Sequence, residues 1–258
     1  MNLKAVRTIG LFTMLLMLGT SYAYAKPVQK NRQYYEERGE IVWEVPTHDK
    51  LIALTFDDGP DPVQTPQILA LLKQYQAKGT FFVLGKWAEN YPELILQEQQ
   101  EGHEVANHTY AHTYAVRSTV QDKYTQDMTA AEQSIIDAGV QRPLLFRPPG
   151  GFYNDMVIEA AKRKGYTIVL WSWHQDTRDW ASPGVAAITN KVLKNARNGD
   201  IVLFHDKVEG KSQTVDALKI ILPKLQEEGY RFVTVSDLLA VKAKEAAKNG
   251  VSSLKQQQ

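Results

Sequence analysis

The chain has 258 residues, of which 43% are hydrophobic and 23% charged, proportions typical of a globular protein and not of a disordered one. Its 30 Lys and Arg residues balance 29 Asp and Glu residues, which argues against nucleic acid as a partner. The absence of cysteine excludes disulfides, a cysteine nucleophile and thiolate metal ligands, so any bound metal must be held by histidine and carboxylate.

The N-terminal residues 1–25 have the pattern of a secretory signal peptide. Lys4 and Arg7 precede an apolar run over residues 9–18, and Ala23-Tyr24-Ala25 provides a small-x-small cleavage site. An uncleaved membrane anchor is the alternative, but about ten strongly apolar residues are fewer than the roughly 20 that span a bilayer. We therefore expect a mature protein that begins near Lys26 and is secreted or associated with the cell wall.

Residues 26–48 are expected to form a linker or arm, and the polar residues before about residue 40 are expected to contribute nothing to the core. After this segment, short apolar segments alternate with longer amphipathic ones. The short segments predict strands at residues 51–56, 80–83, 104–107, 144–146, 167–170, 201–204 and 231–235. The amphipathic segments predict helices at residues 65–75, 92–101, 120–138, 154–164, 185–196, 213–228 and 236–247. The C-terminal tail, residues 242–258, is polar and is expected to fray.

This strand–helix alternation predicts a parallel sheet. A single domain over residues 49–241 with about seven repeats favours closure of the sheet into a (β/α) barrel. An open doubly wound sheet is the alternative fold. In a barrel of this kind the functional site lies at the carboxyl ends of the strands, so the residues that directly follow each strand are the candidates.

Two carboxylates follow the first of these strands. Asp57 and Asp58 come directly before Gly59-Pro60, which turns the chain out of the strand. Because neighbouring side chains on a strand point to opposite faces, both carboxylates can serve one site only where the chain is leaving the strand. A turn or a helix cap would explain one aspartate readily and two poorly.

A histidine pair follows the third strand. His108 and His112 stand at positions i and i+4, a spacing at which two imidazoles can meet one metal ion. With one carboxylate and one open position, they would form a catalytic zinc site. A metalloprotease motif is disfavoured, because Thr109 stands where that motif has glutamate.

Three further segments at strand ends carry chargeable or aromatic groups, at residues 146–151, 171–180 and 203–206. Taken singly, each has an ordinary structural explanation, such as a surface ion pair for Arg147 or core packing for the tryptophans. Their joint occurrence after strands indicates one functional site.

Five motifs, in this order, resemble those of the polysaccharide deacetylases of carbohydrate esterase family four, whose domain is also called NodB-like. They are Thr55-Phe56-Asp57-Asp58-Gly59-Pro60, His108-Thr109-Tyr110-Ala111-His112, Arg147-Pro148-Pro149, Asp176-Thr177-Arg178-Asp179-Trp180 and Leu203-Phe204-His205. The resemblance covers about residues 51–239 and implies a distorted (β/α) barrel, usually of seven parallel strands.

The resemblance also implies the metal site and the base. It makes Asp58, His108 and His112 the ligands of a divalent metal, normally zinc, with cobalt or nickel as alternatives. It makes Asp57 the general base that takes a proton from the attacking water, and it pairs Arg147 with Asp57 to keep this carboxylate ionised and oriented.

The remaining roles concern the leaving group and the substrate. His205 resembles the general acid that protonates the leaving nitrogen, with Asp179 holding its ring and raising its pKa. The backbone N–H of Gly150 would stabilise the oxyanion together with the metal. Leu203 and Trp180 would line a small pocket for the acetyl methyl group.

One position departs from the family pattern. The family usually has an aromatic residue where this chain has Gly150, so the N–H for the oxyanion is kept while one wall of the sugar groove is missing. Phe152 and Tyr153 are candidates to replace that wall. His174, which has no role in the family pattern, is assigned a structural or groove-lining role in preference to that of a fourth metal ligand.

The sequence therefore predicts an exported, metal-dependent hydrolase that removes N-acetyl groups from a polysaccharide, with peptidoglycan as the first choice and chitin-like oligomers as the second. An esterase for O-acetyl groups on a polymer such as xylan is the alternative enzyme. A non-catalytic glycan-binding protein is disfavoured, because every motif position is filled. We expect a monomer with no nucleic-acid or protein partner.

Overall fold

The computed structural model describes residues 30–116 and 120–255, so the predicted signal peptide, residues 1–25, lies outside the described residues. The strands are β1 (Ile41–Val42), β2 (Leu51–Asp57), β3 (Gly79–Val83), β4 (Glu104–Asn107), β5 (Leu145–Phe146), β6 (Thr167–Val169), β7 (Asp200–His205) and β8 (Arg231–Phe232). The α-helices are α1 (Arg32–Glu37), α2 (Gln64–Gln74), α3 (Gly85–Asn90), α4 (Pro92–Gln100), α5 (Gln121–Asp137), α6 (Asp155–Arg163), α7 (Val185–Leu193), α8 (Thr214–Glu227) and α9 (Val235–Lys255). Three short 3₁₀ turns are η1 (Pro149–Gly151), η2 (Trp173–Gln175) and η3 (Asp179–Ala181).

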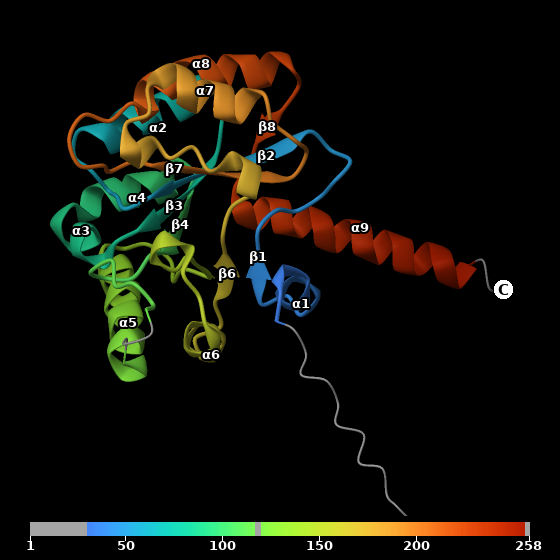
Figure 1. Cartoon of the computed structure of the whole chain (residues 1–258), viewed down its shortest axis with the longest axis horizontal. Coiled ribbons are helices and arrows are strands. Elements are labelled where there is room, and N and C mark those ends of the chain that lie inside the picture. The colour runs from blue at the N-terminus through green and yellow to red at the C-terminus, as the bar shows by residue number, and fades with distance from the viewer. Residues whose placement is uncertain (1–29, 117–119, 256–258) are drawn as a thin grey trace, which may run out of the picture.

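The strands form one sheet in the order β1-β6-β5-β4-β3-β2-β7, with β8 added beside β2, and every paired strand is parallel to its neighbour (Figure 1). The chain that follows β6 joins β7: the Ser172 N–H donates to the Ile201 carbonyl at 3.0 Å, and Asp176 forms a parallel bridge with Leu203. The sheet is thereby curled into a distorted (β/α) barrel. This confirms the predicted fold and excludes the open doubly wound alternative.

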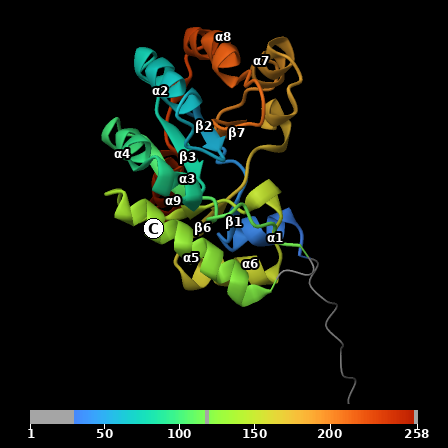
Figure 2. The same ribbon diagram turned by 90° about the vertical axis from the view of Figure 1, so that its left-hand side faces the viewer.

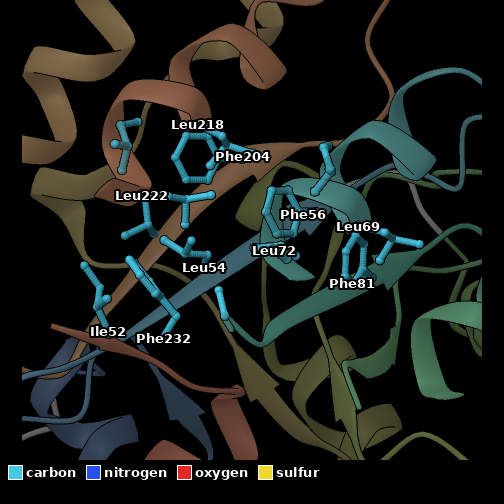
Figure 3. Close-up of a cluster of buried hydrophobic side chains, with 14 of the residues drawn as sticks. Ile52, Leu54, Phe56, Leu69, Leu72, Phe81, Phe204, Leu218, Leu222 and Phe232 are labelled. Atoms are coloured by element: carbon cyan, nitrogen blue, oxygen red, sulfur yellow. The ribbon is translucent and has the colours of Figure 1, made fainter. Parts of the chain in front are cut away.

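The largest hydrophobic core lies between β2, β3 and β7 and the helices α2 and α8 that cover them (Figure 3). At its centre the ring of Phe56 stacks on Phe81 at 4.9 Å and on Phe204 at 5.8 Å. Helices α7 and α8 pack together and α2 packs on α8 (Figure 1 and Figure 2). All seven residues of β2 are buried, as expected for a parallel strand with both faces covered. The packing of these apolar strands therefore holds the carboxyl ends of β2, β3 and β7 in fixed positions.

The segment before residue 49 is part of the barrel. Tyr35 of α1 is only 6% exposed and belongs to the same buried cluster as Trp43 and the apolar face of α6. In β1, Ile41 pairs with Ile168 of β6. The expectation of no core residue before about residue 40 is wrong for Tyr35, because α6 would otherwise expose its apolar face to water.

The C-terminal segment also differs from the expectation. Helix α9 runs to Lys255, where the sequence pattern predicted an end at residue 247 and a fraying tail. The lysines, alanines and glutamate after Val241 favour helix, and the Thr47 hydroxyl donates to the Glu245 carboxylate at 2.9 Å. In Figure 1 this helix extends away from the barrel. Among the described helices, α9 included, none combines the length and apolar character needed to cross a membrane.

Candidate active site

The carboxyl ends of four strands bring the predicted reactive groups together. Arg147 directly follows β5, His108 directly follows β4, Asp57 ends β2 and His205 ends β7. The parallel register places Asp57 beside His205. Because parallel strands end at the same edge of a barrel, residues separated by more than half the chain meet there.

Asp58, His108 and His112 form a cluster whose potential ligand atoms all lie within 4.8 Å of one another. The Oδ1 atom of Asp58 is 3.5 Å from Nε2 of His108 and 3.2 Å from Nε2 of His112. The Nδ1 atom of His108 lies 2.7 Å from the Arg147 carbonyl. Since a carbonyl can only accept, Nδ1 carries a proton, and in the neutral imidazole the lone pair is therefore on Nε2, which faces the cluster.

The electrostatics of this cluster suit a divalent cation. Asp58 Oδ1 is buried and has no hydrogen-bond partner among the described residues. Burial alone would raise the pKa of Asp58, but His108 and, more weakly, His205 and His112 lower it to about 2. Burial and the neighbouring His108 lower the pKa of His112, which favours the neutral imidazole that binds metal. Two imidazoles and one ionised carboxylate therefore fit the predicted metal.

The backbone that carries these ligands is strained. Asp58, Thr109 and His112 have φ angles of 76°, 68° and 61°, the left-handed region that costs a residue with a Cβ atom about 1 kcal/mol or more. Asn107 holds the strained loop, because its side-chain oxygen accepts from the Thr109 N–H at 2.8 Å while its amide donates to the Met128 carbonyl at 2.9 Å. Strain retained at the ligands indicates a site whose geometry matters for function.

Asp57 is fixed by a buried guanidinium. Arg147 Nη1 donates to Asp57 Oδ1 at 2.7 Å and to the Thr55 hydroxyl at 2.9 Å. Its other nitrogens donate to the carbonyls of Val169 and Leu170 at 3.0 and 2.9 Å. Arg147 is completely buried, so every donor direction it uses is set by the fold. The remaining oxygen, Asp57 Oδ2, lies 3.8 Å from Nε2 of His108, at the metal cluster.

His205 is oriented by a second buried carboxylate. Asp179 Oδ1 lies 2.7 Å from Nδ1 of His205, and Asp179 Oδ2 accepts from the Thr214 hydroxyl at 2.6 Å and from the His205 N–H at 2.8 Å. Burial alone would lower the pKa of His205, but Asp179 and, more weakly, Asp57 and Asp58 raise it to about 9. The imidazole is therefore protonated at neutral pH, with Nε2 free to donate a proton.

Gly150 lies in η1 with a φ of 63°, and a Cβ atom there would come within 2.9 Å of the rings of Phe152 and Tyr114. These two rings lie 6.0 Å apart, and Tyr114 also contacts His112, with 4.9 Å between ring centres. Phe152 therefore stands beside Gly150, as the sequence suggested, and Tyr114 joins it. Tyr153 instead packs edge-on against Tyr35, 5.4 Å between ring centres, and against Trp43.

The other predicted residues lie on the segments after β6 and in β7. Trp180 is 53% exposed on η3, and Leu203 is buried within β7, so their part in an acetyl pocket stays a prediction. His174 lies 2.9 Å from Asp200, at the opposite end of β7 from His205. It belongs to a separate cluster with Glu44 and is not a fourth ligand of the triad.

Asp206 is a site residue to which the sequence analysis gave no role. Its buried carboxylate accepts from the Thr65 hydroxyl at 2.6 Å, and its N–H donates to the Asp57 carbonyl at 3.2 Å. A Cβ atom at Gly59 would come within 2.0 Å of this carboxylate, so glycine is required for the close approach. Asp206 thus ties the turn after Asp57 to β7. Its place directly after His205 was the signal available in the sequence.

The family of the chain follows from comparison with known proteins. The family model described as polysaccharide deacetylase matches residues 44–169. A peptidoglycan-N-acetylglucosamine deacetylase of Bacillus cereus is 54% identical over 211 residues, which are 82% of this chain and 98% of that protein. The chain belongs to the polysaccharide deacetylase family, carbohydrate esterase family four.

Solved structures agree with this assignment. The crystal structure of the Bc1960 peptidoglycan N-acetylglucosamine deacetylase, in complex with 4-naphthalen-1-yl-N-oxidanyl-benzamide, superposes with a TM-score of 0.74 at 36% identity, over 79% of this chain and 94% of that one. A family 4 acetyl xylan esterase from Clostridium thermocellum, in complex with a cobalt ion, superposes with a TM-score of 0.70 at 30% identity, over 75% of this chain and 92% of that one.

Proposed function

We propose that this protein is an exported, metal-dependent deacetylase that hydrolyses the N-acetyl group of N-acetylglucosamine in peptidoglycan and releases acetate. The similarity to the Bacillus cereus deacetylase supports this polymer, since 54% identity extends over 98% of that protein. The signal-peptide pattern of residues 1–25 supports export.

Asp58, His108 and His112 would hold the cation, with zinc as the first choice. When bound there, it supplies a Lewis acid that polarises the acetyl carbonyl and makes water more acidic. Asp58 Oδ1, which is buried without a hydrogen-bond partner among the described residues, and Nε2 of His108, which faces it at 3.5 Å, support this assignment.

Asp57 would act as the general base. Its Oδ2 atom faces the metal cluster while Oδ1 is held by Arg147, so one oxygen is available to accept the proton of the attacking water. Arg147 cannot give up its own proton at ordinary pH, and it therefore orients Asp57 without competing for the proton.

His205 would act as the general acid. An amide does not release a free amide anion, so the departing nitrogen has to be protonated as the carbon–nitrogen bond breaks. His205 carries a proton at neutral pH because of Asp179, and its strand position sets it beside Asp57. The backbone N–H of Gly150 would stabilise the oxyanion, and Leu203 and Trp180 would enclose the acetyl methyl group.

The observation that carries the proposal is the presence of separate base and acid groups, each oriented by its own buried partner, at the strand ends that also carry the ligand triad. A protein that only binds glycans has no need of a buried Arg147–Asp57 pair or a charged His205. This argues against the non-catalytic alternative.

The test is acetate release by the mature protein, measured with zinc added and with a chelator present. Peptidoglycan, N-acetylglucosamine oligomers and acetylated xylan are the three substrates. We expect chelator-sensitive release from peptidoglycan, with slower release from the oligomers. Release from xylan alone would replace the proposal with the O-acetyl esterase, and release that persists in chelator would remove the metal from the mechanism.

A further inference from the structure

A pocket of about 290 Å³ is lined in part by Gly150, and it lies beside the candidate active site because Tyr114, next to Gly150, also contacts His112. Its walls are mainly aromatic, with a single acidic group: they include Trp43, Tyr153, Trp171, Trp173 and Asp176. Of these residues, only Asp176 belongs to a motif that the sequence analysis recognised. A concave site with apolar walls and few polar groups is the usual form of a small-ligand site.

The inner wall of the pocket is rigid. Trp171 packs so closely on Gly151 that a Cβ atom there would come within 2.8 Å of its ring. Trp43 is 3% exposed, and its ring lies edge-on to Tyr153 at 5.9 Å. Trp43, which follows β1, therefore forms a rigid wall of this pocket. The segment around β1 thus lines the pocket as well as covering α6.

The outer wall is an indole held out into solvent. Trp173 is 71% exposed, yet the turn that carries it is anchored: the next two side chains, His174 and Gln175, contact Asp200 at 2.9 and 2.8 Å. The Gln175 N–H also donates to the Ser172 carbonyl at 2.7 Å. A large apolar surface that is exposed but fixed indicates a binding surface more than a mobile loop.

The polar group of the pocket selects the kind of ligand. Asp176 is half-buried, and its Oδ1 atom accepts from the Arg178 N–H at 3.1 Å, which leaves acceptor capacity for a hydroxyl or an amide N–H. A flat aromatic surface suits the C–H face of a pyranose ring. A ligand that brings a negative charge to this place would be repelled by the carboxylate.

From this arrangement we propose that the pocket is a second sugar subsite, which binds the pyranose ring next to the one being deacetylated in the same glycan chain. The occupant stacks on Trp173 and donates a hydroxyl or an amide N–H to Asp176. Gly150 borders both sites, so adjoining rings of one chain can occupy them together, and the volume suits a single ring. The inference rests on the proposed deacetylase function.

The test compares Trp173→Ala with Leu144→Ala, a matched loss of an exposed apolar side chain (71% and 60% exposed) outside the pocket. The metal-loaded proteins are assayed on the N-acetylglucosamine tetramer and on 4-nitrophenyl acetate, which has no sugar. The measured quantity is the ratio of kcat/KM for the tetramer to kcat/KM for the ester, because the ratio cancels any loss of active protein.

We expect Trp173→Ala to lower this ratio about fivefold to tenfold, the range of one aromatic stacking contact, and Leu144→Ala to leave it unchanged. Asp176→Asn should lower it in the same direction. A ratio in Trp173→Ala equal to that of the wild type would overturn the subsite.

A binding experiment distinguishes a failure of the subsite from a failure of the proposed deacetylase function. If the wild type releases no acetate from the tetramer, tryptophan fluorescence is titrated with the tetramer. Saturable quenching that Trp173→Ala abolishes supports the subsite, and an absent or unaltered response overturns it.

Discussion

The substitution Asp179→Asn is the sharpest test of the proposal that His205 is the general acid. The substitution keeps the shape of the side chain but removes the negative charge that lies 2.7 Å from Nδ1 of His205. Asp179 is buried, so water cannot replace the lost charge. His205 has to be protonated to act as an acid, and activity should therefore fall as the pH rises through its pKa.

The size of the effect follows from the pKa of His205, which is about 9 in the folded protein against an ordinary value of 6.5. At pH 8 a group with a pKa of about 9 is roughly 90% protonated, whereas one with a pKa of about 6.5 is roughly 3% protonated. Asp179→Asn should therefore cost about 30-fold at pH 8 and only about twofold at pH 6.5. Without the charge of Asp179, burial lowers the pKa of His205 while Asp57 and Asp58 still raise it, so the pKa returns toward its ordinary value.

The assay is kcat/KM against pH between 5.5 and 10 with saturating metal. A bound cation lowers the pKa of His205 in both proteins, so the displacement between the two alkaline limbs is the quantity to compare. We expect the limb of Asp179→Asn to move to lower pH by about 2.5 units, the difference between a pKa of about 9 and the ordinary 6.5. Thr214→Val, which removes one donor to Asp179 but no charge, should move it by much less. Alkaline limbs that fall at the same pH in Asp179→Asn and the wild type would show that His205 is not the titrating acid.

Three further predictions concern the metal, Gly150 and the N-terminal segment. Asp58→Ala and His112→Ala should lose bound metal and activity together, whereas Asp57→Ala should keep the metal, measured by elemental analysis, and lose about 10²-fold or more in kcat; retained turnover in Asp57→Ala would remove the proposed base. Gly150→Ala should lower the free energy of unfolding in urea by about 1–2 kcal/mol, because its φ is 63° and two rings lie 2.9 Å from the added methyl; unchanged stability would contradict that packing. Tyr35→Ala should lower the free energy of unfolding in urea by about 3 kcal/mol. A change under about 0.5 kcal/mol would show that the segment around Tyr35 does not contribute to the core.

The strands and the reactive groups were predictable because both leave short-range patterns. The strands at residues 51–57 and 200–205 contain the apolar runs at residues 51–54 and 201–204, and the reactive residues Asp57 and His205 end these strands. Parallel topology then brings those ends together without any further information. The seven predicted strands and seven predicted helices are all present, with most ends displaced by one to three residues.

The elements that were missed are short or depend on distant contacts. Strand β1 has two residues and helices α1 and α3 have six each, too few for a periodic pattern to emerge. Tyr35 stands in a polar stretch, and only the apolar face of α6, more than a hundred residues later, makes its burial favourable. The extension of α9 to Lys255 was missed because a polar composition was read as disorder, although alanine, lysine and glutamate are strong helix formers.

The proposed substrate groove shows why the reaction is easier to predict from sequence than the polymer. The proposed catalytic groups are fixed by hydrogen bonds that link one motif to another, Asp57 to Arg147 and His205 to Asp179, so the five motifs together define the geometry. The groove is assembled from unrelated segments: Tyr114 comes from the loop after β4, Phe152 from the chain after η1, and Trp43 from the chain after β1. At Gly150 the sequence shows only that a ring is missing, whereas the structure shows that a side chain there would strike two rings supplied from elsewhere. We therefore expect polymer preference in this chain to depend on long-range packing, and exchanging Gly150 for the family's aromatic residue should disrupt the proposed groove instead of restoring it.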